Sequence, residues 1–158
     1  MIKAKRIYDE PEKKDGFRIL VDRLWPRGLS KDRAQLDLWL REAAPSDALR
    51  KWFGHDPARW DEFKRRYFKE LEDKTEAVES IVTKASQGSV TLLYGAKDVY
   101  YNNAVALRGF VEQRAENQYM EERGESHDAH RTFNDRAQTH RAHGRRVERR
   151  DARHTKKG

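Results

Sequence analysis

Hydrophobic residues gather into two short runs in this chain, and each run predicts a buried β-strand. Residues 18–21 read Arg-Ile-Leu-Val, and residues 90–94 read Val-Thr-Leu-Leu-Tyr. Short apolar runs with β-branched side chains, bounded by turn residues, are typical of strands that are covered on both faces. Residues 2–8 alternate apolar and basic positions less regularly, and they predict a further strand at the start of the chain.

Hydrophobic residues at three- and four-residue spacing predict helices between and after these strands. Each helix follows a side chain suited to capping its amino end. These caps are Ser30, Ser46, Asp56, and either Asn102 or Asn103. The first helix is expected to reach Leu40, and the longest helical signal runs from Asp56 to Ala85. Strands that alternate with helices indicate an α/β fold, with a small, mostly parallel sheet flanked by helices.

The composition of the chain changes near residue 113. Apolar side chains become rare beyond that point, whereas arginines and five of the six histidines are concentrated there. Such a segment cannot bury enough apolar surface to offset the entropy lost on ordering. We therefore expect an α/β domain over residues 1–113 and a basic, disordered or helical C-terminal tail over residues 114–158. The histidines of this tail lack a folded scaffold, so no metal site is expected.

Charge and the residue types that are missing narrow the classes of function. The 158 residues carry a formal net charge of +7 at pH 7, which favours acidic partners such as nucleotides, phosphates or nucleic acid. There is no cysteine, so disulfides, thiolate catalysis and thiolate metal sites are excluded. No apolar run is long enough to span a membrane, and the amino-terminal residues lack the apolar core of a signal peptide. A cytoplasmic protein without a membrane partner is expected.

Polar side chains follow two of the predicted strands, where α/β proteins usually bind ligands. Asp22 and Arg23 follow the first run, in a loop that Trp25-Pro26 makes stiff. The second run is followed by Gly95-Ala96-Lys97-Asp98 and then by a helix. Strand, small loop and helix form the local layout of a phosphate-binding turn, although the P-loop spacing is absent. We expect an anion site where these two strand ends meet.

Each candidate residue has a functional and a structural interpretation. Arginines and lysine can hold a phosphate or carboxylate, and an aspartate can act as a general base. The expected ligand-binding residues are Arg23, Arg27, Lys97, Asn102, Asn103 and Tyr94, and the expected catalytic residues are Asp22 and Asp98. Alternatively, Arg23 pairs with one of those aspartates and only ties loop to loop, Asp98 caps the helix, and Tyr94 is part of the core. His55, in a Gly-His-Asp-Pro turn, is expected to have only a polar surface role.

Four blocks in order resemble the bacterial YeaO-like family, catalogued as domain of unknown function 488. They are Lys5-Arg6-Ile7-Tyr8, Val21-Asp22-Arg23-Leu24-Trp25-Pro26-Arg27-Gly28, Ala44-Pro45-Ser46 with Leu49-Arg50, and Leu92-Leu93-Tyr94-Gly95-Ala96-Lys97-Asp98. The resemblance covers residues 1–113 and implies a compact α/β fold related to rhodaneses and cysteine phosphatases, with no established activity. It also marks two departures: the loop at residues 95–98 has no cysteine, and Asn103 stands where the family usually has histidine.

Three classes of function remain open from the sequence. The first is a domain that binds a small anionic ligand, a nucleotide or a phosphorylated metabolite, with hydrolytic or glycosidic chemistry if it has any. The second is a non-enzymatic nucleic-acid-binding accessory protein that acts through its basic tail. The third is a structural domain whose charged loops are ion-paired. The sequence indicates neither a cofactor nor an oligomeric state.

Overall fold

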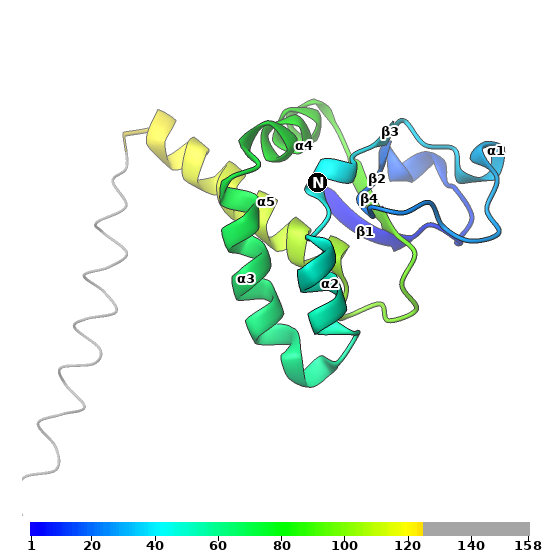
Figure 1. The fold of residues 1–158 in the computed structure, drawn as a ribbon. Helices are drawn as coiled ribbons and strands as arrows, with labels where there is room; N and C mark the ends of the chain where they lie inside the picture. Colours follow the sequence, from blue (N-terminus) through cyan, green and yellow to red (C-terminus); the bar gives the residue numbers. More distant parts are fainter. Residues whose placement is uncertain (125–158) are drawn as a thin grey trace, which may run out of the picture. The chain divides into compact units, whose positions relative to one another are not determined.

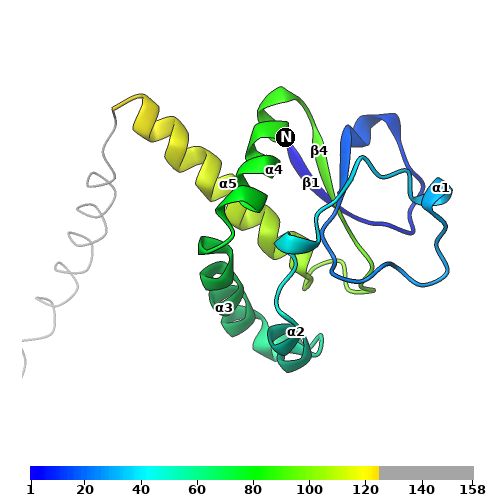
Figure 2. The same cartoon turned by 45° about the horizontal axis from the view of Figure 1, so that its top comes forward.

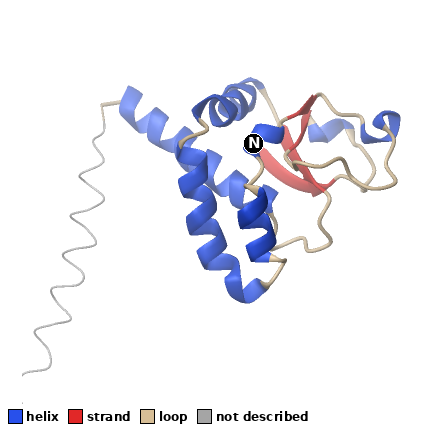
Figure 3. Ribbon diagram, viewed as in Figure 1, coloured by secondary structure: helices blue, strands red, loops and turns tan. Residues whose placement is uncertain are grey.

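A parallel four-stranded sheet forms the centre of the fold. The computed structural model describes residues 1–124, of which residues 1–117 form one compact unit. The strands are β1 (Ile2–Arg6), β2 (Phe17–Leu20), β3 (Leu38–Trp39) and β4 (Val90–Tyr94), arranged in the order β1-β4-β2-β3. All three pairings are parallel, as Figure 3 shows for the strands in red. The predicted α/β fold with a mostly parallel sheet is confirmed.

Five α-helices accompany the sheet in the described part of the chain, together with three single-turn 3-10 helices (Figure 1). The α-helices are α1 (Lys31–Ala34), α2 (Asp47–Phe53), α3 (Trp60–Glu72), α4 (Thr75–Gln87) and α5 (Asn103–Glu122). The 3-10 helices are η1 (Lys13–Asp15), η2 (Arg41–Ala43) and η3 (Pro57–Arg59). The helix α5 is therefore regular across residue 113, and only the tail beyond residue 124 lies outside the described residues. That outer part contains the five tail histidines.

The two faces of the sheet are covered differently, because successive strand residues point to opposite faces. Ile19 and Leu92 pack with buried residues of α2, α3, α4 and α5 in one large core. Leu20 and Leu93 point the other way and pack with Ala34 and the loop that follows β2. Figure 2 shows α4 beside the sheet on the first side and α1 on the other. The predicted burial of both apolar runs is confirmed.

The prediction of a helix from Ser30 to Leu40 is wrong beyond the first helical turn. The helix α1 ends at Ala34, and Gln35 adopts a left-handed conformation with φ of 47°. Arg18, from the neighbouring strand, donates hydrogen bonds to the carbonyl oxygens of both residues. Leu38 and Trp39 then pair with β2 as strand β3. In a longer helix, backbone N–H groups of the next turn would donate to these carbonyl oxygens. Here the buried side chain of Arg18 donates to them instead.

The long helical signal ending at Ala85 corresponds to two α-helices instead of one. The break comes between Glu72 and Thr75, with no glycine or proline to mark it. The two helices have different partners: α3 packs on α2, whereas α4 contacts β4. The ammonium group of Lys74, which lies in the break, donates a hydrogen bond to the carbonyl oxygen of Ala44 at 2.7 Å. Tertiary packing therefore divides a pattern that is continuous in the sequence.

The predicted caps are confirmed. The hydroxyls of Ser30 and Ser46 accept hydrogen bonds from the backbone of α1 and α2, and Asp56 does the same for η3. The side chain of Asn102 accepts from Val105 N at 3.0 Å and so caps α5. Within residues 1–124, no helix is long and apolar enough to cross a membrane.

Candidate functional site

A cavity of about 280 Å³ lies at the carboxyl ends of β2 and β4. Its lining combines residues that follow these two strands with residues of α2, α3 and α5. The lining residues are Asp22, Arg23, Leu24, Ala44, Pro45, Arg50, Phe53, His55, Phe63, Gly95, Ala96, Asn102 and Asn103. The cavity lies where the two predicted strand ends meet, and of the expected site residues it is lined by Asp22, Arg23, Asn102 and Asn103.

Asp22 joins the two strand ends. Its carboxylate accepts hydrogen bonds from Gly95 N at 2.8 Å and from the side-chain amide of Asn103 at 3.0 Å. Gly95 allows this close approach, because a Cβ atom there would lie 3.2 Å from a carboxylate oxygen. Burial raises the pKa of Asp22, and the two hydrogen bonds and nearby His55 and Arg50 only partly offset it. The carboxylate fixes the floor of the cavity.

Arg23 lines the cavity with a donor that has no hydrogen-bond acceptor in the described part of the chain. Its Nη2 donates to the carbonyl oxygen of Pro45 at 3.3 Å. Its Nε is buried and, among residues 1–124, has no hydrogen-bond acceptor. The nearest ion pair of this nitrogen is with Asp47 Oδ1 at 3.8 Å, beyond hydrogen-bonding distance. Arg23 does not pair with either of the aspartates that the sequence suggested.

A second arginine comes from α2. The Nη2 atom of Arg50 lies 3.6 Å from Asp47 Oδ1, the same oxygen that lies closest to Arg23. The two guanidinium groups thus share one carboxylate, and neither is within hydrogen-bonding distance of it. Arg50 belongs to one of the four family blocks, but the sequence does not predict that it lines the cavity, because its approach to the strand ends depends on how α2 packs.

His55 also lines the cavity, so its expected role as a surface residue is incomplete. It is exposed, and its backbone adopts φ of 55°, directly after Gly54 with φ of 53°. Its ring packs edge-on against Phe53, with centroids 6.0 Å apart. A left-handed conformation is strained for a residue with a Cβ atom. Its place in the turn Gly54-His55-Asp56-Pro57, between two helical segments, is the sequence signal that could have drawn attention to it.

The wall of the cavity formed by Ala44 and Pro45 is held by side chains of the helical layer. The hydroxyl of Tyr67 donates a hydrogen bond to the carbonyl oxygen of Ala43, the residue before this wall. Glu70 accepts hydrogen bonds from both the backbone N–H and the hydroxyl of Ser46, each at 2.7 Å. With the contact from Lys74, this wall is fixed before any ligand arrives.

Four of the expected site residues are placed elsewhere. Arg27 is exposed, and its carbonyl oxygen accepts a hydrogen bond from the hydroxyl of Tyr8 at 2.9 Å. Lys97 is exposed and does not line the cavity. Asp98 accepts from the backbone N–H groups of the two residues at 100 and 101, which lowers its pKa. Tyr94 is buried in the larger core, and burial raises its pKa.

The remaining expected residues, Asn102 and Asn103, are brought to the cavity. The side chain of Asn102 is occupied at both ends, since it caps α5 and donates to the carbonyl oxygen of Asp98. Asn103 donates to Val21 O and to Asp22. Residues 1–124 contain no group of three or more histidines, cysteines, aspartates or glutamates that could hold a metal ion.

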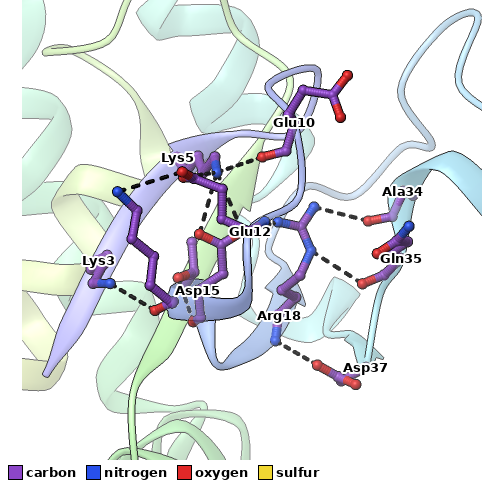
Figure 4. Close-up of polar contacts among 11 residues, drawn as sticks. Lys3, Lys5, Glu10, Glu12, Asp15, Arg18, Ala34, Gln35 and Asp37 are labelled. Atoms are coloured by element: carbon purple, nitrogen blue, oxygen red, sulfur yellow. Dashed lines mark hydrogen bonds and ion pairs between the residues drawn. The ribbon is translucent and has the colours of Figure 1, made fainter.

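A different polar cluster lies at the amino end of β2 (Figure 4). Arg18 donates to Asp15 at 2.5 Å and to the carbonyl oxygens at the end of α1, and its side chain is almost completely buried. Lys5 contacts Asp15 at 3.3 Å and Glu12 at 2.9 Å. Burial alone would raise the pKa of Asp15, but hydrogen bonds from Glu12 N, Lys5 and Arg18 lower it. The charged groups of the cluster pair with one another, although Glu12 and Arg18 also line a separate hollow of about 430 Å³.

The comparisons with known proteins identify relatives along nearly the whole described chain. Residues 1–136 match the model of DUF488-N3i, described as the inactive DUF488-N3 subclade. The uncharacterized protein YeaO of Escherichia coli is 42% identical over 110 residues, which cover 70% of this chain and 96% of that protein. The uncharacterized protein Rv3073c of Mycobacterium tuberculosis is 34% identical over 113 residues, 72% of this chain and 95% of its own length.

No solved structure matches the chain, so the implied relation to rhodaneses and cysteine phosphatases gains no support from these comparisons. The family match covers all the residues of the cavity and extends past the end of the described region. Together with the YeaO relative it confirms the family that the four sequence blocks resemble. This chain belongs to the inactive DUF488-N3 subclade of YeaO-like proteins.

Proposed function

We propose that the cavity at the ends of β2 and β4 binds a small anionic ligand, a nucleotide or a phosphorylated metabolite, without converting it. The observation that carries the proposal is the Nε donor of Arg23, which is buried beside a cavity and lacks a hydrogen-bond acceptor among residues 1–124. A buried donor without a partner costs about 1–3 kcal/mol. The oxygen of an anion beside Arg23 and Arg50 would relieve that cost.

The remaining lining suggests how the rest of the ligand is held. Phe53 and Phe63 stack with ring centroids 4.3 Å apart and give the cavity an apolar side. Leu24, which is 62% exposed, adds an apolar edge. Pockets for small molecules commonly combine such apolar walls with a few charged groups that fix orientation. A molecule with an anionic group next to a flat or apolar group fits this combination.

Neither expected catalytic aspartate is well suited to act as a base. Both oxygens of Asp22 accept hydrogen bonds from the protein itself. Asp98 does not line the cavity, and its lowered pKa makes it a weaker base. The subclade is also described as inactive. These points support binding without turnover over the hydrolytic alternative.

The test is ligand-dependent thermal stabilisation of the full chain by adenosine monophosphate and by sugar phosphates. We expect stabilisation of the wild type and its loss in Arg23→Ala, because ligand binding to the folded state raises the melting temperature. Arg27→Ala is the matched control, since this exposed arginine lies in the same loop but outside the cavity. Equal shifts in both variants, or no shift for any ligand in the wild type, would refute the proposal.

A second candidate is binding of nucleic acid by the tail. Residues 125–158 contain ten lysines and arginines against five aspartates and glutamates. Such a segment would contact phosphates without sequence preference, with an affinity that falls steeply as salt rises. The measurement is binding of the full chain and of a chain ending at residue 124 to a single-stranded oligonucleotide at several salt concentrations. Equal affinity of the two chains would exclude this candidate.

A further inference from the structure

We propose that Asp47 is an internal competitor for the anion site, and that a phosphate group displaces it from between Arg23 and Arg50. The inference rests on the proposed function and adds to it how the site is regulated. One carboxylate oxygen of Asp47 lies 3.8 Å from Arg23 Nε and 3.6 Å from Arg50 Nη2. The protein thus already places a negative charge next to both guanidinium groups that line the cavity, although Asp47 itself is not among the lining residues.

The contact of Asp47 with the two arginines is weak. Both distances exceed the range of a hydrogen bond, and a single oxygen serves both guanidinium groups. The side chain of Asp47 is 60% exposed, so it can rotate into solvent. Ion pairs that are this exposed contribute little free energy. Asp47 therefore lowers the affinity for an anion without closing the site.

The arginines do not depend on Asp47 for their positions. Arg23 is anchored through Nη2 to the carbonyl oxygen of Pro45, in the wall that Glu70 and Lys74 hold. Arg50 belongs to α2, which Ser46 caps. Only the side chain of Asp47 has to move when an anion enters, so displacement requires no change of fold.

The geometry favours a phosphate over a single carboxylate oxygen as the displacing group. An anion with three terminal oxygens can offer different oxygens to Arg23 and Arg50, at hydrogen-bonding distance from each. Asp47 offers one oxygen to both and reaches neither. A dianionic phosphate also carries more charge than the carboxylate it replaces. The ligand class that follows is a phosphomonoester.

The test measures the affinity of the full chain for inorganic phosphate by calorimetry in three proteins. We expect Asp47→Asn to bind phosphate roughly 1.5- to 5-fold more tightly than the wild type, the size expected when a partly exposed ion pair no longer competes. Asp61→Asn is the matched control. Like Asp47, Asp61 is an acidic residue in the first turn of a helix, so Asp61→Asn changes the net charge and the charge at a helix amino end in the same way. Asp61 pairs with Lys64 and with neither arginine of the cavity.

A second measurement isolates the coupling. In an Arg50→Gln background, Asp47→Asn should improve phosphate binding by less than it does in the wild type, because one of the shared partners is gone. Cooperative thermal melts of every variant check that each protein folds.

The outcomes separate the two proposals. Phosphate binding of equal strength in the wild type and Asp47→Asn overturns the competitor role and leaves the anion site standing. An equal gain in Asp61→Asn also overturns it, since net charge would explain the effect. Absence of phosphate binding in both the wild type and Asp47→Asn refutes the anion site and the competitor role together.

Discussion

An aspartate and an arginine lie at each end of β2, and the two pairs differ in how completely their polar atoms are satisfied. At the amino end, Arg18 is buried, and each of its three nitrogens donates a hydrogen bond. At the carboxyl end, the side chain of Arg23 is 39% exposed and its Nε has no acceptor within residues 1–124. The sequence places the same two residue types within a few positions of each strand end.

The difference separates charges that build the fold from charges that await a ligand. The cluster around Asp15 and Arg18 joins β1, η1 and the end of α1, so its charges are neutralised inside the protein. The carboxylate oxygens of Asp22 instead accept hydrogen bonds from N–H groups. The Nε atom of Arg23 has no carboxylate within hydrogen-bonding distance, since Asp47 lies 3.8 Å away. A protein can tolerate such incomplete satisfaction at a binding site, because the bound ligand supplies the missing partner.

The largest expected effect comes from the same substitution at both ends of β2. Arg18→Met should lower the free energy of unfolding by about 3–5 kcal/mol, because it leaves the buried Asp15 short of a partner and two carbonyl oxygens without donors. Arg23→Met should lower it by less than about 1 kcal/mol, since this side chain is partly exposed. Urea denaturation measures both values. Equal losses would break the distinction between the two ends.

The two left-handed residues allow a test of intermediate size. Gln35 belongs to the Arg18 cluster, and His55 lines the cavity. At each position the glycine variant should be more stable than the alanine variant by about 1 kcal/mol, because only glycine adopts positive φ without strain. Only the variants at His55 should also change phosphate affinity. Denaturation and calorimetry on the four proteins check this, and altered binding in the variants at Gln35 would contradict the assignment.

The smallest effect is in the pH dependence of stability, where the two aspartates should act with opposite sign. The folded-state pKa of Asp15 is lowered, so its stabilising contribution is complete above the unfolded pKa near 3.8 and is lost as pH falls through the folded value. The folded-state pKa of Asp22 is raised. Its contribution is therefore largest below the unfolded pKa and is lost as pH rises through the folded value.

Asp15→Asn and Asp22→Asn isolate these contributions when each is compared with the wild type by urea denaturation between acidic and neutral pH. The stability difference between the wild type and Asp15→Asn should shrink as pH falls. The difference between the wild type and Asp22→Asn should shrink as pH rises. Slopes of the same sign would show that the two ends of β2 are not electrostatically distinct.

The sequence by itself determined the elements whose cause is local. Apolar runs with β-branched residues gave β2 and β4, and short polar side chains before apolar periodicity gave the caps Ser46 and Asn102. It also determined that the two strand ends meet, because parallel strands bring their carboxyl ends to the same edge. Asp22, Arg23 and Asn103 of the candidate site could therefore be predicted.

Only the tertiary structure decided which charges face the cavity. Arg27 and Lys97 lie in the expected loops but point elsewhere, whereas Arg50 and His55 reach the cavity from α2 and the turn after it. Tertiary contacts also decide where α1 ends, because the side chain of Arg18 donates hydrogen bonds to the last carbonyl oxygens of that helix. Periodicity records which face of an element is apolar, but it does not encode where that element packs. The direction of a long charged side chain depends on contacts between residues far apart in the chain.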